Sequence, residues 1–136
     1  MNIENNISNL KNSIPDYVEI VAVSKTKPIN DLIKAYHVGQ RIFGENKVQE
    51  MVTKFEKLPK DIEWHMIGHL QTNKVKYMAS FVNTIHSVDS YKLLKEIQKQ
   101  AFKNNRKIKC LIQIRIANED TKFGIEPSEL NDFLNF

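Results

Sequence analysis

The sequence has a single cysteine, Cys110, so no disulfide can form within the chain. This sparse use of cysteine is typical of a reducing compartment, and we expect a cytoplasmic protein. No apolar stretch approaches the roughly 20 residues that a membrane span needs. The N-terminal segment MNIENNISNLKNS is polar and does not resemble a secretory signal. We therefore expect neither a disulfide-stapled secreted protein nor a membrane protein.

Arginine is also scarce, occurring only at Arg41, Arg106 and Arg115. The formal net charge of +4 and the pI near 9.1 would suit a nucleic-acid partner. However, the lysines are spread along nearly every segment among 16 acidic residues, and arginine is the usual reader of phosphate and guanine. We do not expect nucleic acid as a partner.

Short β-branched or apolar runs alternate with segments of helical spacing. The runs predict strands at residues 18–23, 41–43, 62–67, 82–86 and 108–116. Apolar stripes predict helices over residues 29–36, 48–55 and 93–101, with a further helix at the N-terminus. Candidate helix boundaries are Asp89 and Ser90 as N-caps, Gly39 after a helix end, and Pro127 in a first turn.

This alternation is the βαβ pattern of a parallel sheet, and two α/β architectures fit it. An open doubly wound sheet would favour a glycine-rich loop after the first strand, but Ser24-Lys25-Thr26-Lys27-Pro28 contains no glycine. The pattern therefore favours a (β/α)8 barrel. A complete barrel needs about 200 residues or more, and this chain has room for about five strands. We expect residues 1–136 to form a single, incomplete barrel domain.

Reactive groups of parallel α/β folds collect at the carboxyl ends of the strands. The polar residues predicted there include Lys25, Lys27, Glu45, Asn46, His69, Asn73, His86 and Lys122. Partial desolvation at a barrel mouth would lower the pKa of Lys25 and make its amine a nucleophile for an aldehyde. The plain alternatives are solvated loop lysines at Lys25 and Lys122, and an N-cap role for Glu45.

The stretch from Trp64 to Lys74 is the densest aromatic and polar segment. His65 and His69 are four residues apart, like a helical metal pair, but the strand-like residues between them oppose that geometry, and we expect no metal. We expect Trp64 and Met66 to be packing residues, with His69 or Asn73 near a ligand.

Five motifs stand in the order found in one known family. They are Ala22–Pro28 (AVSKTKP), Phe43–Asn46 (FGEN) with Gln49-Glu50, Trp64–Lys74 (WHMIGHLQTNK), Ile85–Asp89 (IHSVD) and Glu119–Gly124 (EDTKFG). Together they closely resemble the pyridoxal phosphate homeostasis proteins, whose fold is similar to the barrel domain of alanine racemase. The resemblance runs from about Val18 to Ile125.

This resemblance implies a protein that binds pyridoxal 5′-phosphate (PLP) and maintains the vitamin B6 pool, without a robust reaction of its own. It implies that Lys25 holds PLP as a Schiff base and that Lys27 and Lys122 are accessory lysines. Asn46 and His86 match positions that line the cofactor pocket. The implied partners are PLP, amino acids and PLP enzymes awaiting their cofactor. The resemblance also implies a monomer for full-length members of the family.

Two departures from the family keep other interpretations open. The family's barrel continues for further units that grip the phosphate, so this chain could be a truncated product with impaired binding, and its open edges could promote association. Arg115 stands where the family usually has asparagine, and on an inner face it would need a carboxylate or phosphate partner.

A racemase-like enzyme would need a second acid–base group, and no tyrosine follows a predicted strand.

Overall fold

The computed structural model describes residues 2–117 and 123–135. Its elements are α1 (Ile3–Asn12), β1 (Ala22–Val23), α2 (Ile29–His37), β2 (Ile42–Glu45), α3 (Val48–Lys57), β3 (Glu63–Met66), η1 (Thr72–Lys74), α4 (Val75–Met78), β4 (Val82–Val88), α5 (Tyr91–Lys103), β5 (Lys109–Ile112), η2 (Pro127–Glu129) and α6 (Leu130–Leu134). The strands form one five-stranded sheet in the order β1-β2-β3-β4-β5, and all its neighbouring strands are parallel.

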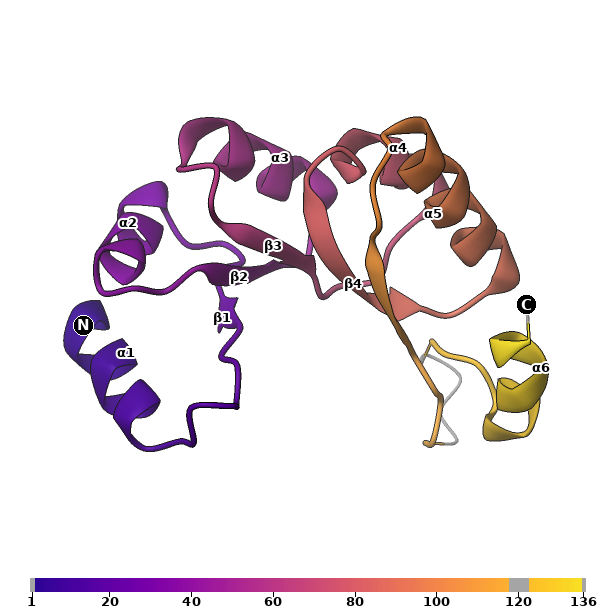
Figure 1. The fold of residues 1–136 in the computed structure, drawn as a ribbon, viewed down its shortest axis with the longest axis horizontal. Helices are drawn as coiled ribbons and strands as arrows, with labels where there is room; N and C mark the ends of the chain where they lie inside the picture. The colour runs from indigo at the N-terminus through magenta and orange to yellow at the C-terminus, as the bar shows by residue number, and fades with distance from the viewer. Residues whose placement is uncertain (1, 118–122, 136) are drawn as a thin grey trace.

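The sheet curves like part of a barrel wall. Helices α2, α3, α4 and α5 lie along its outer, convex side, and no helix of the described residues covers the opposite face (Figure 1). A doubly wound sheet would carry helices on both faces. The predicted α/β fold, a partial (β/α)8 barrel with about five βα units, is therefore confirmed, and the open-sheet alternative is wrong.

The first strand is shorter than the sequence predicts, because a side chain replaces part of its ladder. The buried amide of Gln40 donates from Nε2 to the carbonyl of Ile20 at 2.8 Å and to that of Ile42 at 2.7 Å. Regular pairing of β1 with β2 is thus confined to Ala22 and Val23. A hydrophobic run cannot reveal that a glutamine 20 residues away supplies the missing bond.

The fifth strand is also shorter than predicted, whereas the fourth is longer. Beyond β5 the chain turns to meet a later segment, and the Ile125 amide donates to the Gln113 carbonyl at 2.9 Å. Strand β4 continues through His86 to Val88. His86 is therefore inside a strand and not at its end, which corrects the predicted boundary.

The helices agree closely with their predicted faces and boundaries. Leu32 and Ala35 of α2 are buried, and Gly39 follows that helix with a left-handed φ of +96°. The Ser90 hydroxyl caps α5 by accepting a bond from the Leu93 amide at 3.1 Å. The short helix α4 was not among the predicted stripes, since four residues are too few to display a helical period.

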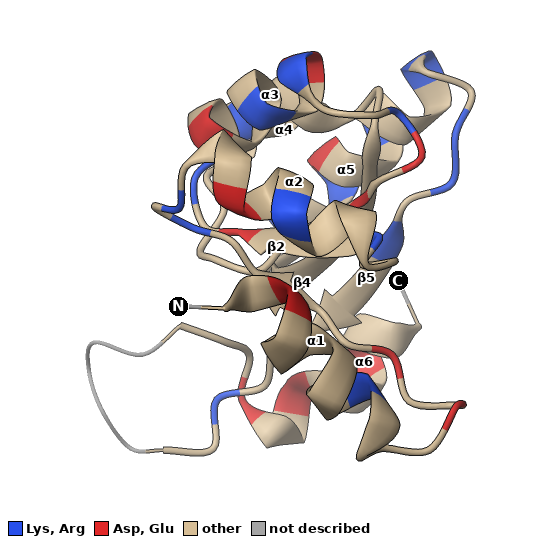
Figure 2. Ribbon diagram, turned by 90° about the vertical axis from the view of Figure 1, so that its left-hand side faces the viewer, with Lys and Arg blue, Asp and Glu red and all other residues tan. Residues whose placement is uncertain are grey.

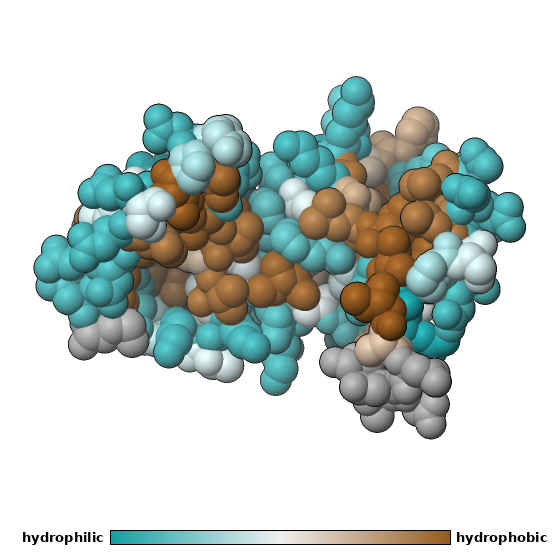
Figure 3. Space-filling view, turned by 90° about the horizontal axis from the view of Figure 1, so that it is seen from below, coloured by the Kyte–Doolittle hydropathy of each residue, from teal (hydrophilic) through white to brown (hydrophobic). Residues whose placement is uncertain are grey.

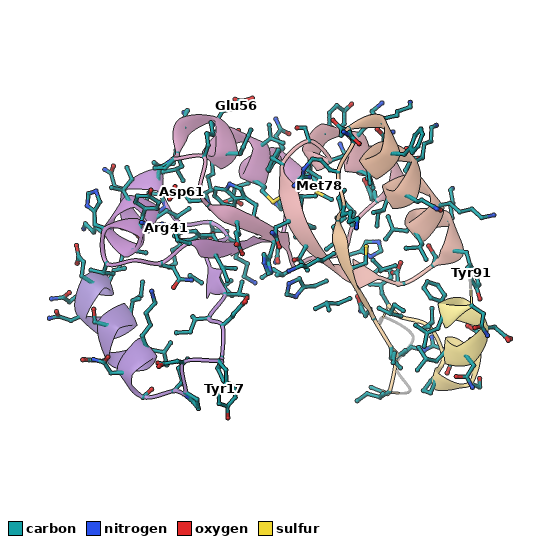
Figure 4. The ribbon with its side chains drawn as sticks, viewed as in Figure 1. Tyr17, Arg41, Glu56, Asp61, Met78 and Tyr91 are labelled. Carbon is teal, nitrogen blue, oxygen red and sulfur yellow. The ribbon has the colours of Figure 1, made fainter. Side chains whose placement is uncertain are left out.

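The core lies between the convex side of the sheet and the helices. Trp64 and Met66 are among its most buried side chains, which confirms their predicted packing role, and the rings of Trp64 and Phe43 are 5.9 Å apart. Met78, labelled in Figure 4, brings α4 into the same core and is fully buried. Cys110 is only half-buried, so the prediction of an interior cysteine is partly wrong.

The two faces of the sheet differ in polarity. Lysines and acidic residues are interspersed on the outer helices (Figure 2). Viewed from the open side, apolar residues form brown patches (Figure 3), and Val23 and Leu111 are 55% and 52% exposed. Within residues 2–117 and 123–135, no helix combines the length and apolar character needed to cross a membrane.

Replacing Met78 with alanine should lower the free energy of unfolding by about 2–5 kcal/mol, because the change leaves a cavity in the core. Urea denaturation followed by circular dichroism measures the loss. The neighbouring Lys76 is exposed, so Lys76→Ala should change stability by less than about 0.5 kcal/mol. Equal losses in the two variants would contradict this description of the core.

Candidate functional site

The carboxyl ends of the first three strands meet on one rim of the half-barrel. The Ser24 amide donates to the Gly44 carbonyl at 3.0 Å, and the Ile67 amide donates to the Glu45 carbonyl at 2.9 Å. A Cβ atom added to Gly68 would lie only 2.7 Å from the Asn46 carbonyl oxygen. The rim therefore brings the loop of Lys25 close to the segments that carry Asn46 and Gly68.

Lys25 lies in the turn that follows β1, with its side chain exposed. This exposure disagrees with the partial desolvation of Lys25 that the sequence analysis predicted at the barrel mouth. Among the described residues, the Lys25 amine has no hydrogen-bond or ion-pair partner. Lys27 is exposed in the same loop, where its backbone amide donates to the Ser24 carbonyl at 3.1 Å. Both amines are accessible to a ligand.

Glu45 is not the predicted N-cap but the last residue of β2, with a fully buried side chain. Its Oε2 accepts hydrogen bonds from the Ser24 hydroxyl and, at 2.9 Å, from Lys54 Nζ. Lys54 is itself buried and also donates to the Ser24 carbonyl and to Glu50 Oε2, each at 2.7 Å. We call Ser24, Glu45, Glu50 and Lys54 the loop clasp.

The pKa values of the two carboxylates of the loop clasp are shifted in opposite directions. Burial raises the pKa of Glu45, and the bonds from Ser24 and Lys54 offset only part of this effect. The bond from Lys54 lowers the pKa of the more accessible Glu50, with help from the Thr26 amide. Near neutral pH, Glu50 is thus the firmer anionic partner of Lys54.

Thr26, next to Lys25, has a left-handed backbone with φ of +63°. This region is unfavourable for a β-branched residue, and such a conformation costs about 1–3 kcal/mol. The Thr26 amide donates to Glu50 Oε2 at 2.7 Å, which holds the residue in this conformation. The sequence did not predict this conformation, because its usual signal is a glycine or asparagine and this position holds a threonine.

His86 pairs with a histidine of the neighbouring strand. Its Nε2 lies 2.8 Å from His65 Nδ1, so one ring donates a proton and the other accepts it. Val23, Gly44 and His65 are aligned across the sheet and face the same side. The exposure of Val23 identifies this as the open face. His86 therefore lies toward the barrel interior, and its predicted place in a cofactor pocket stays a prediction.

Burial lowers the pKa of both histidines, and the nearby His86 charge lowers that of His65 further. At neutral pH both rings are therefore held neutral. His65 Nδ1 lies beside His86 Nε2 and His69 Nδ1 beside Asp89 Oδ2, so the two rings that the sequence spacing could pair have different partners. Within the part of the chain that the structure describes, no group of three potential ligands could hold a metal ion.

His69 lies beside a cavity on the outer side of the rim, and Asn73 lines a second cavity, which His69 and Asp89 also line. His69 Nδ1 is 3.5 Å from Asp89 Oδ2, and its ring stacks on Phe123 with centroids 3.8 Å apart. A cavity of about 650 Å³ opens between α3 and α4, with Asn46, His69 and Lys74 in its lining. The lining also includes Lys47, Val48, Gln49, Val52, Leu70, Gln71 and Tyr77.

Two further predictions concern the loop after β5. Lys122 lies outside the described residues, so its predicted role stays a prediction. Arg115 forms an ion pair with Glu126, which confirms that this arginine has a carboxylate partner. Both side chains are partly exposed, so the pair contributes little to stability.

The chemistry of the rim fits PLP in one respect. An aldehyde needs a nucleophilic amine that is not already engaged, and the Lys25 amine is both accessible and unpaired among the described residues. Asn46, directly after β2, adds an amide, and His86, in β4, adds an imidazole. Lys25, Asn46 and His86 form no hydrogen bonds with one another in the described chain, so a ligand would have to connect them.

The histidine pair should make stability fall as the solution becomes acidic. Because its pKa values are lowered in the fold, the unfolded chain binds protons first as the pH falls through about 6.5. The full stabilisation is present above that pH and is lost below it. Urea denaturation at pH 7.5 and 5.5 should show a smaller loss for the double variant His65→Gln/His86→Gln. The exposed His37→Gln variant should retain the parent's pH dependence.

Replacing Gly68 with alanine should displace Asn46, because the new Cβ would lie 2.7 and 2.9 Å from its carbonyl oxygen and Cα. Backbone atoms cannot move aside as a flexible side chain does, so we expect a loss of about 1–3 kcal/mol in unfolding free energy. Urea denaturation measures it, and amide chemical shifts should change at Asn46. The exposed Asn73→Ala variant in the same segment should show neither effect.

Comparisons with known proteins agree with this geometry. A curated pyridoxal phosphate homeostasis protein of Aquifex aeolicus is 44% identical over 119 residues, covering 87% of this chain and 52% of the relative. One from Pasteurella multocida is 37% identical, covering 97% of this chain and 62% of the relative. The chain thus spans about half to three-fifths of the length of these relatives.

Among solved structures, PipY of Synechococcus elongatus PCC7942 with PLP bound superimposes with a TM-score of 0.89. It is 34% identical, and the alignment covers 98% of this chain and 62% of PipY. The family model for the alanine racemase N-terminal domain matches residues 1–136. The chain therefore belongs to the alanine racemase N-terminal domain family.

Proposed function

We propose that this chain binds PLP through a Schiff base on Lys25 and serves as a carrier in PLP homeostasis. The observation that carries the proposal is the accessible Lys25 amine, which lies on the rim at the carboxyl end of β1. The related proteins of Aquifex and Pasteurella, and PipY with its bound PLP, support the same choice of cofactor.

In this proposal, PLP supplies an aldehyde, and its condensation with the Lys25 amine releases one water molecule. The chain's own residues orient the ligand. Asn46 offers amide donors and acceptors at the end of β2, and His86, held neutral near pH 7, offers one hydrogen bond from the open face. Lys27 and Lys122 would attract the phosphate as it arrives or leaves.

A carrier function suits this rim better than racemisation. A racemase would need a second acid–base group facing the bound amino acid. The Tyr36 hydroxyl is engaged, since it donates to Asp61 at 2.7 Å. Asp61 also pairs with Arg41, just before β2 begins and so at the opposite end of that strand from the rim (Figure 4). Tyr36 is therefore assigned a structural role.

We further propose a cytoplasmic protein that exchanges PLP with amino acids or with PLP enzymes awaiting their cofactor. The lone thiol of Cys110 suits a reducing compartment, and burial raises its pKa and so lowers its reactivity. We propose residues 1–136 as a single incomplete barrel domain. Family members are expected to be monomers, whereas the exposed apolar residues of the open face favour association of this chain.

Mixing the protein with PLP and then adding borohydride should fix one pyridoxyl group on Lys25. Peptide mass spectrometry locates the label. The Lys25→Ala variant should be labelled at least about ten-fold less, since Lys54 is buried with its donors engaged and no other described lysine ends the first strand at the rim. Lys34→Ala, an exposed change on α2, provides the matched control and should label as the parent does. Equal labelling of Lys25→Ala would contradict the proposal.

A further inference from the structure

Lys54 is unusual because it is a buried lysine in the middle of a surface helix. Only 4% of its surface is exposed. Lysine is almost never buried this deeply unless its charge is paired. Its ammonium donates to the Ser24 carbonyl, Glu45 Oε2 and Glu50 Oε2 at 2.7, 2.9 and 2.7 Å. An ammonium has three protons, so these bonds use its full donor capacity.

The bonds of the loop clasp connect both neighbours of Lys25 to the rest of the fold. On one side, the Ser24 hydroxyl donates to Glu45, and the Ser24 carbonyl accepts from Lys54. On the other side, the Thr26 amide donates to Glu50. The backbone is therefore fixed before and after Lys25, although the Lys25 side chain is exposed and free to reach a ligand.

A purely structural role explains this arrangement less well. Well-packed apolar side chains usually stabilise a protein as much as a buried ion pair does, so a buried pair alone is weak evidence for stability. Here the acceptors of the Lys54 ammonium come from the loop after β1, the end of β2 and α3. Two bonds of the loop clasp involve a direct neighbour of Lys25, because Lys54 donates to the Ser24 carbonyl and the Thr26 amide donates to Glu50. Thr26 is also held in its left-handed conformation.

We propose that Lys54, with Glu50, is a positioning residue that fixes the backbone on both sides of Lys25 and so directs its amine toward the ligand. This inference rests on the proposed function of Lys25. Without the loop clasp, Ser24–Pro28 would sample other conformations, and only a fraction of molecules would present the amine correctly. Apparent affinity falls in proportion to that fraction.

The test uses the full chain with Lys54→Met and Glu50→Ala, and with Lys57→Met as the matched control. Lys57 lies on the same helix but is exposed. Glu50 is partly exposed, so its truncation should leave a folded protein even if Lys54→Met does not fold. Glu50→Gln retains an oxygen that can accept from the Thr26 amide and should restore most of the lost effect.

Two measurements are made on each variant. In the absence of PLP, amide hydrogen exchange should become about ten-fold faster at Thr26 and Lys27 in Glu50→Ala and Lys54→Met, and should not change in Lys57→Met. In a PLP titration followed by borohydride, half-maximal labelling of Lys25 should require about ten-fold more PLP in the same variants. A thermal melt confirms that each variant is folded.

The outcomes separate the two proposals. If the parent shows no labelling at Lys25, the proposed function is wrong, and hydrogen exchange still decides whether the clasp holds the loop. If Lys25 is labelled in the parent, unchanged exchange in folded Glu50→Ala overturns the positioning role. Faster exchange with unchanged labelling also overturns it, because the clasp would then fix the loop without directing the amine.

Discussion

Parallel pairing of the strands is the constraint on which the site depends. Because β1, β2, β3, β4 and β5 all run in one direction, their carboxyl ends gather on one rim. The loop of Lys25, the Asn46 backbone and the Gly68 segment are thereby brought together from separate parts of the sequence. Close packing at Gly68, where a Cβ would meet the Asn46 backbone, sets how tightly these segments approach.

At the rim, hydrogen bonds fix the backbone on both sides of Lys25, whereas the Lys25 side chain is exposed. Glu45 and Lys54 are buried charges in a protein of modest size, and burying charge is costly unless every polar atom is paired. Glu45 Oε1 has no partner among the described residues, so the pairing is incomplete. The fold tolerates this cost beside Lys25, which agrees with the tendency of functional sites to retain locally unfavourable features.

Much of the fold could be predicted from the sequence, because apolar periodicity reports burial directly. Leu32, Trp64 and Met66 show this, and the parallel sheet followed from the alternation of strands and helices. The site was less accessible to prediction. Lys54 is one charged residue on an amphipathic helix, and nothing in its spacing indicates that it reaches the loop after β1. The contact between His65 and His86 likewise depends on strand register, which sequence patterns leave open.

The bond from Gln40 to Ile20 also affects the outer edge of the sheet. By interrupting the ladder, it leaves β1 with only Ala22 and Val23 in regular pairing. A strand this short offers an incoming chain few aligned backbone groups, so it is a poor template for edge-to-edge assembly. The opposite edge, β5, is longer, and its charged Lys109 is exposed. The two edges therefore resist unwanted strand addition differently, one by irregular backbone and the other by charge.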